Sequence, residues 1–162
     1  TKDKNNEIFL TEYGKISAKE QTKRFRLASK FLHEILKIEL KDVFQEAHRL
    51  EHAMSQEVEN SIEKLLNYPV KDPFGQDIPG SQKLRTKKII PLSETSINKT
   101  YILSKIPPEN SEFVDFLHKN NIIPGSKITI EEISDTRGII SIKVNKKTLD
   151  LALNVAKTIW VK

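Results

Sequence analysis

The sequence contains no cysteine, and this absence excludes two kinds of structure. Without thiols the chain forms neither a disulfide framework nor a thiolate metal site, so a metal centre would have to use imidazole and carboxylate ligands. Long apolar runs are also absent, and none approaches the roughly 20 residues that a membrane-spanning helix needs. We therefore expect no membrane partner, and the lack of disulfides favours a cytoplasmic protein.

The chain does have the balance of a soluble globular protein, with 37% hydrophobic and 30% charged residues. Its net charge of +5 is unevenly spread, because residues 81–162 hold 14 Lys and Arg against 8 Asp and Glu. Two short basic segments, 15–26 and 83–88, permit contact with nucleic acid. A solvated surface explains such segments without any partner, and we favour that interpretation.

The first half of the sequence has the period of helices. Residues 17–66 contain neither proline nor glycine, and their apolar residues recur at intervals of three and four. This pattern predicts helices over 17–37 and 41–53, and a third helix that begins after Ser55. Ser55 is a favourable N-cap residue, and the glutamates that follow it suit the first turn of a helix.

Two segments of different character flank these helices. Residues 7–14 (EIFLTEYG) alternate weakly and end in glycine, which predicts a short strand whose partner lies outside the sequence. Residues 67–80 carry three prolines and two glycines, so regular structure must stop there. We place a linker at 81–90, ahead of a second domain.

The second half has the composition of a small β-domain. We expect strands in four segments rich in Ile, Val and aromatic residues: 99–106, 126–133, 138–145 and 157–162. Between the strands, the sequence predicts a short helix at residues 111–119 and a hairpin turn at residues 135–138. It predicts one more short turn at residues 148–157, before the last strand. So many strands in a short stretch fit a small closed barrel, because closure removes exposed sheet edges. The fold class is therefore α+β, with three helices followed by a β-barrel.

The segment EAHRLEHAMS (46–55) contains H-x-x-E-H, formed by His48, Glu51 and His52. On a helix, residues three and four apart share a face, so these side chains can converge on one metal ion. Zinc peptidases use this spacing, with a glutamate that activates water, but they also need a third ligand and a substrate cleft. The solvated face of an amphipathic helix fits the pattern as well. A third alternative is a module without metal, in which the barrel binds a peptide.

The order of the segments adds a resemblance to a known family. EAHRLEHAMSQEVENSIEKLL, followed by DPFGQDIPG, resembles the dimerisation domain of the diphtheria toxin repressor family of iron- and manganese-dependent transcriptional regulators. PLSETSINKTYILSKI, FLHKNNIIPGSKITI and the terminal ALNVAKTIWV resemble the SH3-like domain of that family, which is shared with the ferrous-iron transport protein A. The most specific parts are E-A-H-R-L-E-H-x-M-S and P-F-G-x-x-I-P-G.

This resemblance implies a domain organisation and a function. Residues 1–14 would be the remnant of a DNA-binding wing, 15–80 a helical metal-binding and dimerisation domain, and 91–162 an SH3-like domain. The chain would be the regulatory part of a metal-dependent repressor that controls metal homeostasis, and not an enzyme. It would form a homodimer and reach operator DNA through a winged helix-turn-helix domain that precedes this region. No small organic substrate is implied.

The resemblance also implies the metal ligands. The three ligand positions of the family motif correspond to His48, Glu51 and His52, and the family metals are Fe²⁺ and Mn²⁺. The first position commonly holds Cys or Glu, so His48 is a departure. Imidazole in place of a thiolate or carboxylate makes the site less anionic and favours Fe²⁺, Ni²⁺, Co²⁺ or Zn²⁺ over Mn²⁺.

A second metal site of the family is not implied for this chain. Its ligands would fall on Phe25, Ser29 and Phe44, and none of these side chains is a plausible ligand. Glu109 and Glu112 lie near the place where relatives add ligands from the SH3-like domain. They are weaker candidates, because acidic residues near a helix start are explained by the helix dipole. We therefore expect one metal site.

Overall fold

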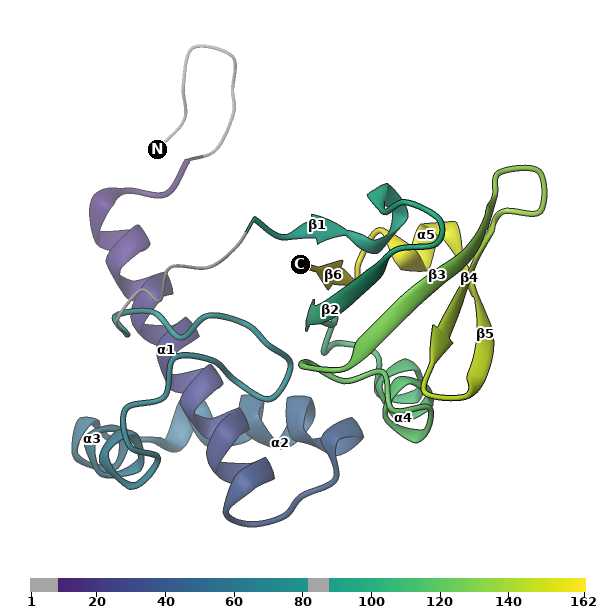
Figure 1. The fold of residues 1–162 in the computed structure, drawn as a ribbon. Helices are drawn as coiled ribbons and strands as arrows, with labels where there is room; N and C mark the ends of the chain where they lie inside the picture. The colour runs from purple at the N-terminus through teal and green to yellow at the C-terminus, as the bar shows by residue number, and fades with distance from the viewer. Residues whose placement is uncertain (1–8, 82–87) are drawn as a thin grey trace.

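The computed structural model describes residues 9–81 and 88–162, which form a helical part and a sheet part (Figure 1). The helical part consists of α1 (Glu12–Glu34), α2 (Leu40–Ala53) and α3 (Gln56–Leu65), with α2 and α3 both packed against α1. The three predicted helices are thus confirmed. Ser55 is the N-cap of α3, since its hydroxyl accepts a hydrogen bond from the Val58 N–H at 3.3 Å. In the described part of the chain, no helix could cross a membrane.

The strand predicted at residues 7–14 is wrong for the residues that the structure describes. Helix α1 already begins at Glu12, and Thr11 caps it by accepting a hydrogen bond from the Gly14 N–H at 3.0 Å. This bond satisfies one of the free backbone donors of the first turn. Gly14, which suggested the end of a strand, lies inside that turn. Residues 1–8, with most of the predicted wing remnant, lie outside the described residues.

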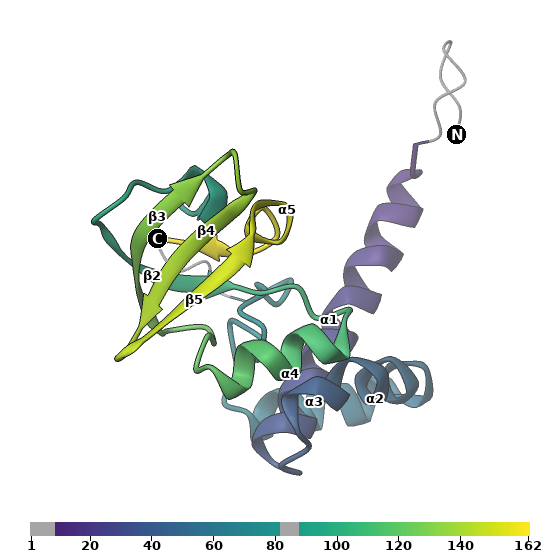
Figure 2. The same ribbon diagram turned by 90° about the vertical axis from the view of Figure 1, so that its right-hand side faces the viewer.

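The sheet part is a six-stranded sheet in the order β1-β6-β2-β3-β4-β5, with every neighbouring pair antiparallel. The strands are β1 (Ile90–Pro91), β2 (Thr100–Lys105), β3 (Lys127–Ser134), β4 (Ile139–Val144), β5 (Lys147–Ala152) and β6 (Trp160–Val161). Each edge strand leads into a short helical segment, η1 (Leu92–Glu94) after β1 and α5 (Leu153–Ala156) after β5. These two segments pack against each other, which brings the edges of the curved sheet together (Figure 2).

The structure confirms the four predicted strands and adds two, the short β1 and β5, of which β5 lies where the sequence pattern predicts a turn. Residues 148–152 of the predicted turn belong to this strand, and only α5 is helical. The reason is a tight connection from β4, in which Asn145 takes a left-handed φ of 56°. Asparagine tolerates this conformation, which two-residue hairpin turns need. Leu149 and Leu151 then fall on the same face of β5, with Leu151 buried.

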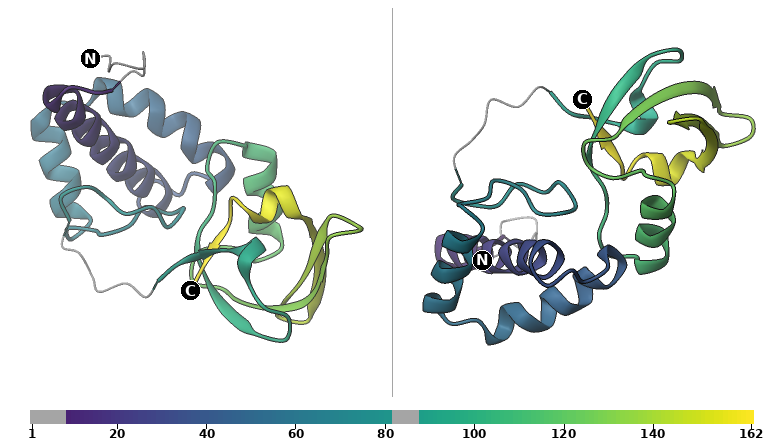
Figure 3. Two further views of the ribbon diagram at one scale, coloured as in Figure 1. Left: turned by 90° about the horizontal axis from the view of Figure 1, so that it is seen from above. Right: turned by 60° about the horizontal axis from the view of Figure 1, so that its bottom comes forward.

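Two apolar cores meet at α2. The first turns of α2 supply Leu40 and Val43 to the core beneath the sheet, while Ala47 belongs to the core between the helices. Helix α4 (Ser111–Lys119), which the sequence predicts correctly, packs against α2 at this junction (Figure 3). The helical and sheet parts are therefore joined by side-chain packing as well as by the chain itself.

The segment 69–80, which we call the interdomain loop, also fastens the two parts together. Phe74 is fully buried in the core of the sheet part, and its carbonyl oxygen accepts a hydrogen bond from the Ile106 N–H at 3.0 Å. Ile78 is buried in the helical core. The loop thus places one apolar side chain in each core.

Gly75 allows this approach, because its backbone lies directly against β2. A Cβ atom at Gly75 would be 1.9 Å from the carbonyl oxygen of Ser104. Gly80 has nearly the same φ, +84° against +83° for Gly75, but a Cβ there would meet nothing within 4 Å. The two glycines therefore form a matched pair. A side chain would be strained by the backbone conformation at either position, but only at Gly75 would it also collide with neighbouring atoms.

We predict that Gly75→Ala lowers the free energy of unfolding much more than Gly80→Ala. Both substitutions place alanine at positive φ, which costs roughly 1 to 2 kcal/mol. Only the first forces the interdomain loop away from β2, which adds on the order of 2 kcal/mol. Urea unfolding of the two variants measures the difference directly. Equal losses would show that the contact between the loop and β2 contributes nothing to stability.

Candidate metal centre

Helix α2 brings His48, Glu51 and His52 together on one face, as the sequence spacing predicts. One carboxylate oxygen of Glu51, Oε1, lies 3.1 Å from Nδ1 of His48 and 3.6 Å from Nε2 of His52. The two imidazole rings are edge to face, with their centroids 5.0 Å apart. One ligand atom from each of the three residues can be chosen so that all lie within 4.8 Å of one another. Among the described residues, these three form the one group of histidine and acidic side chains that is close enough together to hold a metal ion.

These distances fit a common metal ion. Imidazole nitrogens and carboxylate oxygens bind ions such as Zn²⁺ at about 2.0 to 2.2 Å, so neighbouring ligand atoms stand roughly 3.0 to 3.5 Å apart in tetrahedral or octahedral sites. The two observed separations from Glu51 Oε1 are close to this range. Small rotations of the exposed imidazoles would be enough to bring three donors to an ion.

Burial of Glu51 gives the cluster its electrostatic character. Its side chain is 5% exposed, whereas those of His48 and His52 are 59% and 62% exposed. A buried carboxylate needs a compensating charge or hydrogen bonds. The basic side chains within 4 Å of it, among the described residues, are these two imidazoles, which are neutral unless protonated. A bound divalent cation would supply the compensating charge, and the exposed imidazoles leave a route for the ion to enter.

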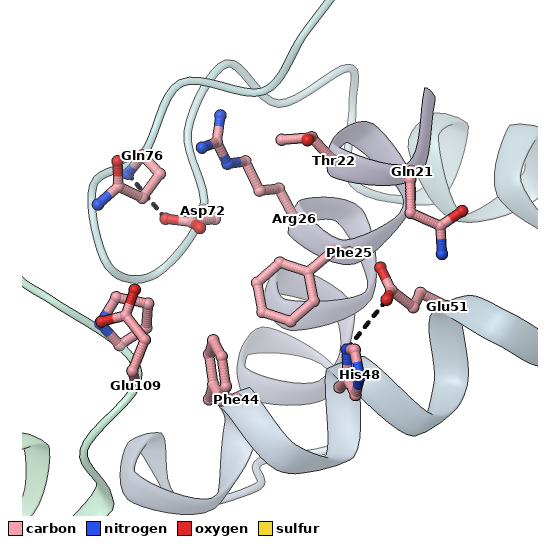
Figure 4. Close-up of a pocket in the computed structure, with 11 residues that line it drawn as sticks. Gln21, Thr22, Phe25, Arg26, Phe44, His48, Glu51, Asp72, Gln76 and Glu109 are labelled. Atoms are coloured by element: carbon pink, nitrogen blue, oxygen red, sulfur yellow. Dashed lines mark hydrogen bonds and ion pairs between the residues drawn. The ribbon is translucent and has the colours of Figure 1, made fainter. Parts of the chain in front are cut away.

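The cluster opens into a cavity of about 400 Å³ between the helical and sheet parts (Figure 4). His48 and Glu51 lie on one side of this cavity, and the interdomain loop contributes Asp72 and Gln76 on the other. Glu109, from the segment before α4, also lines it. The structure thus brings Glu109 to the cavity, and Glu112 is not among the lining residues.

Aromatic rings fill the place where the resemblance would put a second metal site. Phe25 and Phe44 pack edge to face with centroids 5.3 Å apart, and both line the cavity. Ser29 is fully buried, and its hydroxyl donates a hydrogen bond to the Phe25 carbonyl oxygen at 2.8 Å. These three residues therefore offer no free ligand toward the cavity.

Asp72 is a polar group of the cavity that the sequence did not single out. Its Oδ1 accepts hydrogen bonds from the N–H groups of Phe74 at 3.0 Å and Gln76 at 2.8 Å, which hold the turn of the interdomain loop. Its Oδ2 is buried without a hydrogen-bond partner among the described residues. Burial raises the pKa of this carboxyl to about 6, against the opposing effect of the Gln76 hydrogen bond and the positive charge of Arg26. The Asp-Pro-x-Gly sequence of residues 72–75 is the signal that could have pointed to Asp72, because it indicates a turn. The burial of Asp72, however, depends on the tertiary fold.

The fold and the cluster together define the class of protein: a helical domain with a candidate metal centre, joined to a small SH3-like sheet domain. Residues 11–80 match the family model described as the iron dependent repressor, metal binding and dimerisation domain. Residues 90–162 match the FeoA domain. The chain therefore belongs to the iron-dependent repressor family, the family that includes the diphtheria toxin repressor.

Individual relatives agree with this assignment. The diphtheria toxin repressor of Corynebacterium diphtheriae is 29% identical, over 94% of this chain and 71% of that protein. The iron-dependent repressor IdeR of Mycobacterium leprae is 27% identical over 78% of this chain, and the match spans 61% of the relative, less than two thirds of its length. A solved manganese-dependent transcriptional repressor in complex with manganese has a TM-score of 0.87 and 27% identity, covering 96% of this chain and 75% of that one.

We predict that Asp72→Asn removes one pH-dependent contribution to stability. The pKa of Asp72 is about 6 in the folded chain, above its ordinary value of 3.8. The folded state therefore favours the protonated form, and the stability from this carboxyl is full below about pH 4 and lost as the pH rises through about 6. Asparagine keeps the Oδ1 acceptor and does not ionise. Relative to the wild type, the variant should gain up to about 3 kcal/mol between pH 4 and pH 7.

Urea unfolding of both proteins across this pH range checks the prediction. Taking the difference between the two curves cancels the other titrating groups, including Asp77, whose pKa is lowered because its ion pairs with Lys105 and Lys71 outweigh its desolvation. Parallel curves would show that Asp72 is not desolvated in the folded chain.

Proposed function

We propose that this chain is the metal-sensing and dimerising part of a metal-dependent transcriptional repressor. The observation that carries the proposal is the convergence of His48, Glu51 and His52 around a buried carboxylate in a member of the iron-dependent repressor family. The family consists of repressors and not of enzymes, and we assign no catalytic role to Glu51. Such a regulator works in the cytoplasm, where its operator lies.

Fe²⁺ or Mn²⁺ is the ion that the family and its relatives suggest, and the donor set refines this choice. Two imidazoles and one carboxylate form a site of intermediate softness. Because the site has no thiolate and only one carboxylate, we propose that it prefers Fe²⁺, Ni²⁺, Co²⁺ or Zn²⁺ to Mn²⁺. Each metal-binding histidine must present a nitrogen lone pair to the ion, while Glu51 supplies the negative charge.

The position of the site suggests how binding would be transmitted. The cluster lies beside a cavity that the helical and sheet parts build together, so an ion there can alter how neighbouring elements are held. We propose that a DNA-binding domain outside this chain docks near the cluster, and that metal favours the orientation of two such domains that fits an operator. This requires the ion to bind one orientation more tightly than the other.

Dimerisation would involve the helices of residues 40–66. Helix α3 leaves Val58 and Leu65 exposed, at 44% and 59%, and Tyr68 just beyond it is 65% exposed. Covering such a face is a common role of a second copy in a two-fold dimer. A monomer in sedimentation equilibrium at micromolar concentration would count against this part of the proposal.

We predict that His48→Ala and Glu51→Gln each weaken metal binding by at least about tenfold, or 1.4 kcal/mol. His48→Ala removes one of two imidazoles, and Glu51→Gln removes the charge of the central carboxylate. Anaerobic calorimetric titration with Fe²⁺, Mn²⁺, Zn²⁺ and Ni²⁺ measures both effects and ranks the ions. Mn²⁺ winning the competition would overturn the proposed preference.

His118→Ala provides the matched control, because His118 is an exposed histidine near the end of α4 that does not line the cavity. It should bind metal like the wild type. A loss of binding in all three variants would point to general damage, and unchanged binding in all three would place the ion elsewhere.

A further inference from the structure

Helix α1 brings a glutamine to the candidate metal centre. Gln21 lies 31 residues before His52 in the sequence, yet its side-chain Nε2 is 3.5 Å from Nδ1 of His52. Gln21 is half-buried and lines the same cavity as His48 and Glu51, and in Figure 4 the nitrogen of its amide points toward Glu51. The contact joins two helices at the cluster.

The two ring nitrogens of His52 therefore have different neighbours. Nε2 lies 3.6 Å from Glu51 Oε1, and Nδ1 faces the amide of Gln21. A neutral imidazole carries its proton on one nitrogen and a lone pair on the other. If Nε2 is to bind a metal beside Glu51, the proton must be on Nδ1, where it needs an acceptor.

We infer that Gln21 is a positioning residue for His52, which orients the ring and selects its tautomer for metal binding. This inference rests on the proposed metal site. Histidines that bind metals nearly always donate their other ring N–H to a fixed acceptor. The amide of Gln21 becomes that acceptor when it turns by 180° about its terminal bond and presents Oε1 to Nδ1–H.

The same amide also suits the metal-free state. With Nε2 facing Nδ1, as the structure has it, Gln21 donates to a lone pair on Nδ1 while the proton of His52 is on Nε2, facing Glu51. Metal binding then moves the proton: Nε2 releases one to solvent and Nδ1 takes one up, so the charge of the ring does not change. Glutamine is suited to this exchange because it carries both a donor and an acceptor on one group.

Substitutions at Gln21 separate these roles. Gln21→Leu removes both donor and acceptor, and should weaken Ni²⁺ binding by roughly 10- to 100-fold, the usual effect of losing a partner of a metal-binding histidine. Gln21→Glu keeps only acceptor oxygens, and should bind Ni²⁺ at least as tightly as the wild type. Gln45→Leu makes the same change at an exposed glutamine on α2 that does not line the cavity, and should leave Ni²⁺ binding unchanged.

The deciding experiment combines calorimetric titration of Ni²⁺ with NMR of the histidine ring nitrogens in the metal-free chain. We expect Gln21→Glu to shift His52 toward the Nδ1–H tautomer and Gln21→Leu to remove the tautomer preference of the wild type. His33 is the internal reference, because its Nδ1 is 3.0 Å from the Ile38 carbonyl oxygen, away from Gln21.

The two readouts keep this inference distinct from the proposed function. Ring-nitrogen signals of His52 that are the same in the wild type and in Gln21→Leu would overturn the inference, as would equal Ni²⁺ affinities. A wild-type chain that binds no Ni²⁺ would overturn the proposed function, and the role of Gln21 in tautomer selection would then be judged from the ring nitrogens alone.

Discussion

The double packing of α2 is the constraint on which the rest of the structure depends. The first turns of this helix bury Leu40 and Val43 in the core of the sheet part, and its later turns pack Ala47 against α1. With both ends held, the face that carries Glu51 cannot rotate away from α1. The carboxylate of Glu51 is therefore buried, while His48 lines the cavity and His52 stays exposed. A helix packed on one side alone would leave the same three residues on a solvated surface.

The interdomain loop extends this constraint to the sheet part. Phe74 and Ile78 are buried in different cores, and Gly75 lets the backbone of the loop touch β2. Asp72 holds the turn at the cost of a buried carboxyl, which burial shifts toward its protonated form by raising its pKa to about 6. The cavity beside the candidate metal centre is thus built by segments far apart in the sequence, and its shape depends on how the two parts are fastened.

Local signals in the sequence predict most elements and the core of the candidate site. Helical periodicity locates three helices, and Ser55 marks the start of the third. The H-x-x-E-H spacing is sufficient to place the three candidate ligands on one face, because all three belong to one helix. The strand predicted at residues 7–14 was wrong because a glycine such as Gly14 often marks the end of a strand. Here the hydroxyl of Thr11 caps the helix, and Gly14 belongs to its first turn. β5 was missed because its connection to β4 uses Asn145 and no glycine.

Groups that reach the site from other elements could not be predicted in this way. Gln21 is 31 residues from His52, and the burial of Asp72 exists only once the interdomain loop has docked. No periodicity or motif links such residues, since their proximity follows from helix packing. The same holds for Phe25 and Phe44: the sequence shows that they cannot bind metal, and only the structure shows that they pack on each other and occupy the space.

The central claim is that an ion is held by two imidazole nitrogens of α2 together with the buried carboxylate of Glu51. X-ray absorption spectroscopy of the chain loaded with substoichiometric Ni²⁺ tests it most directly, because imidazole rings give a recognisable multiple-scattering pattern. The account predicts a first shell of nitrogen and oxygen with scattering from two imidazoles, reduced to one in His48→Ala. A shell of oxygen alone, or a spectrum that His48→Ala leaves unchanged, would contradict it.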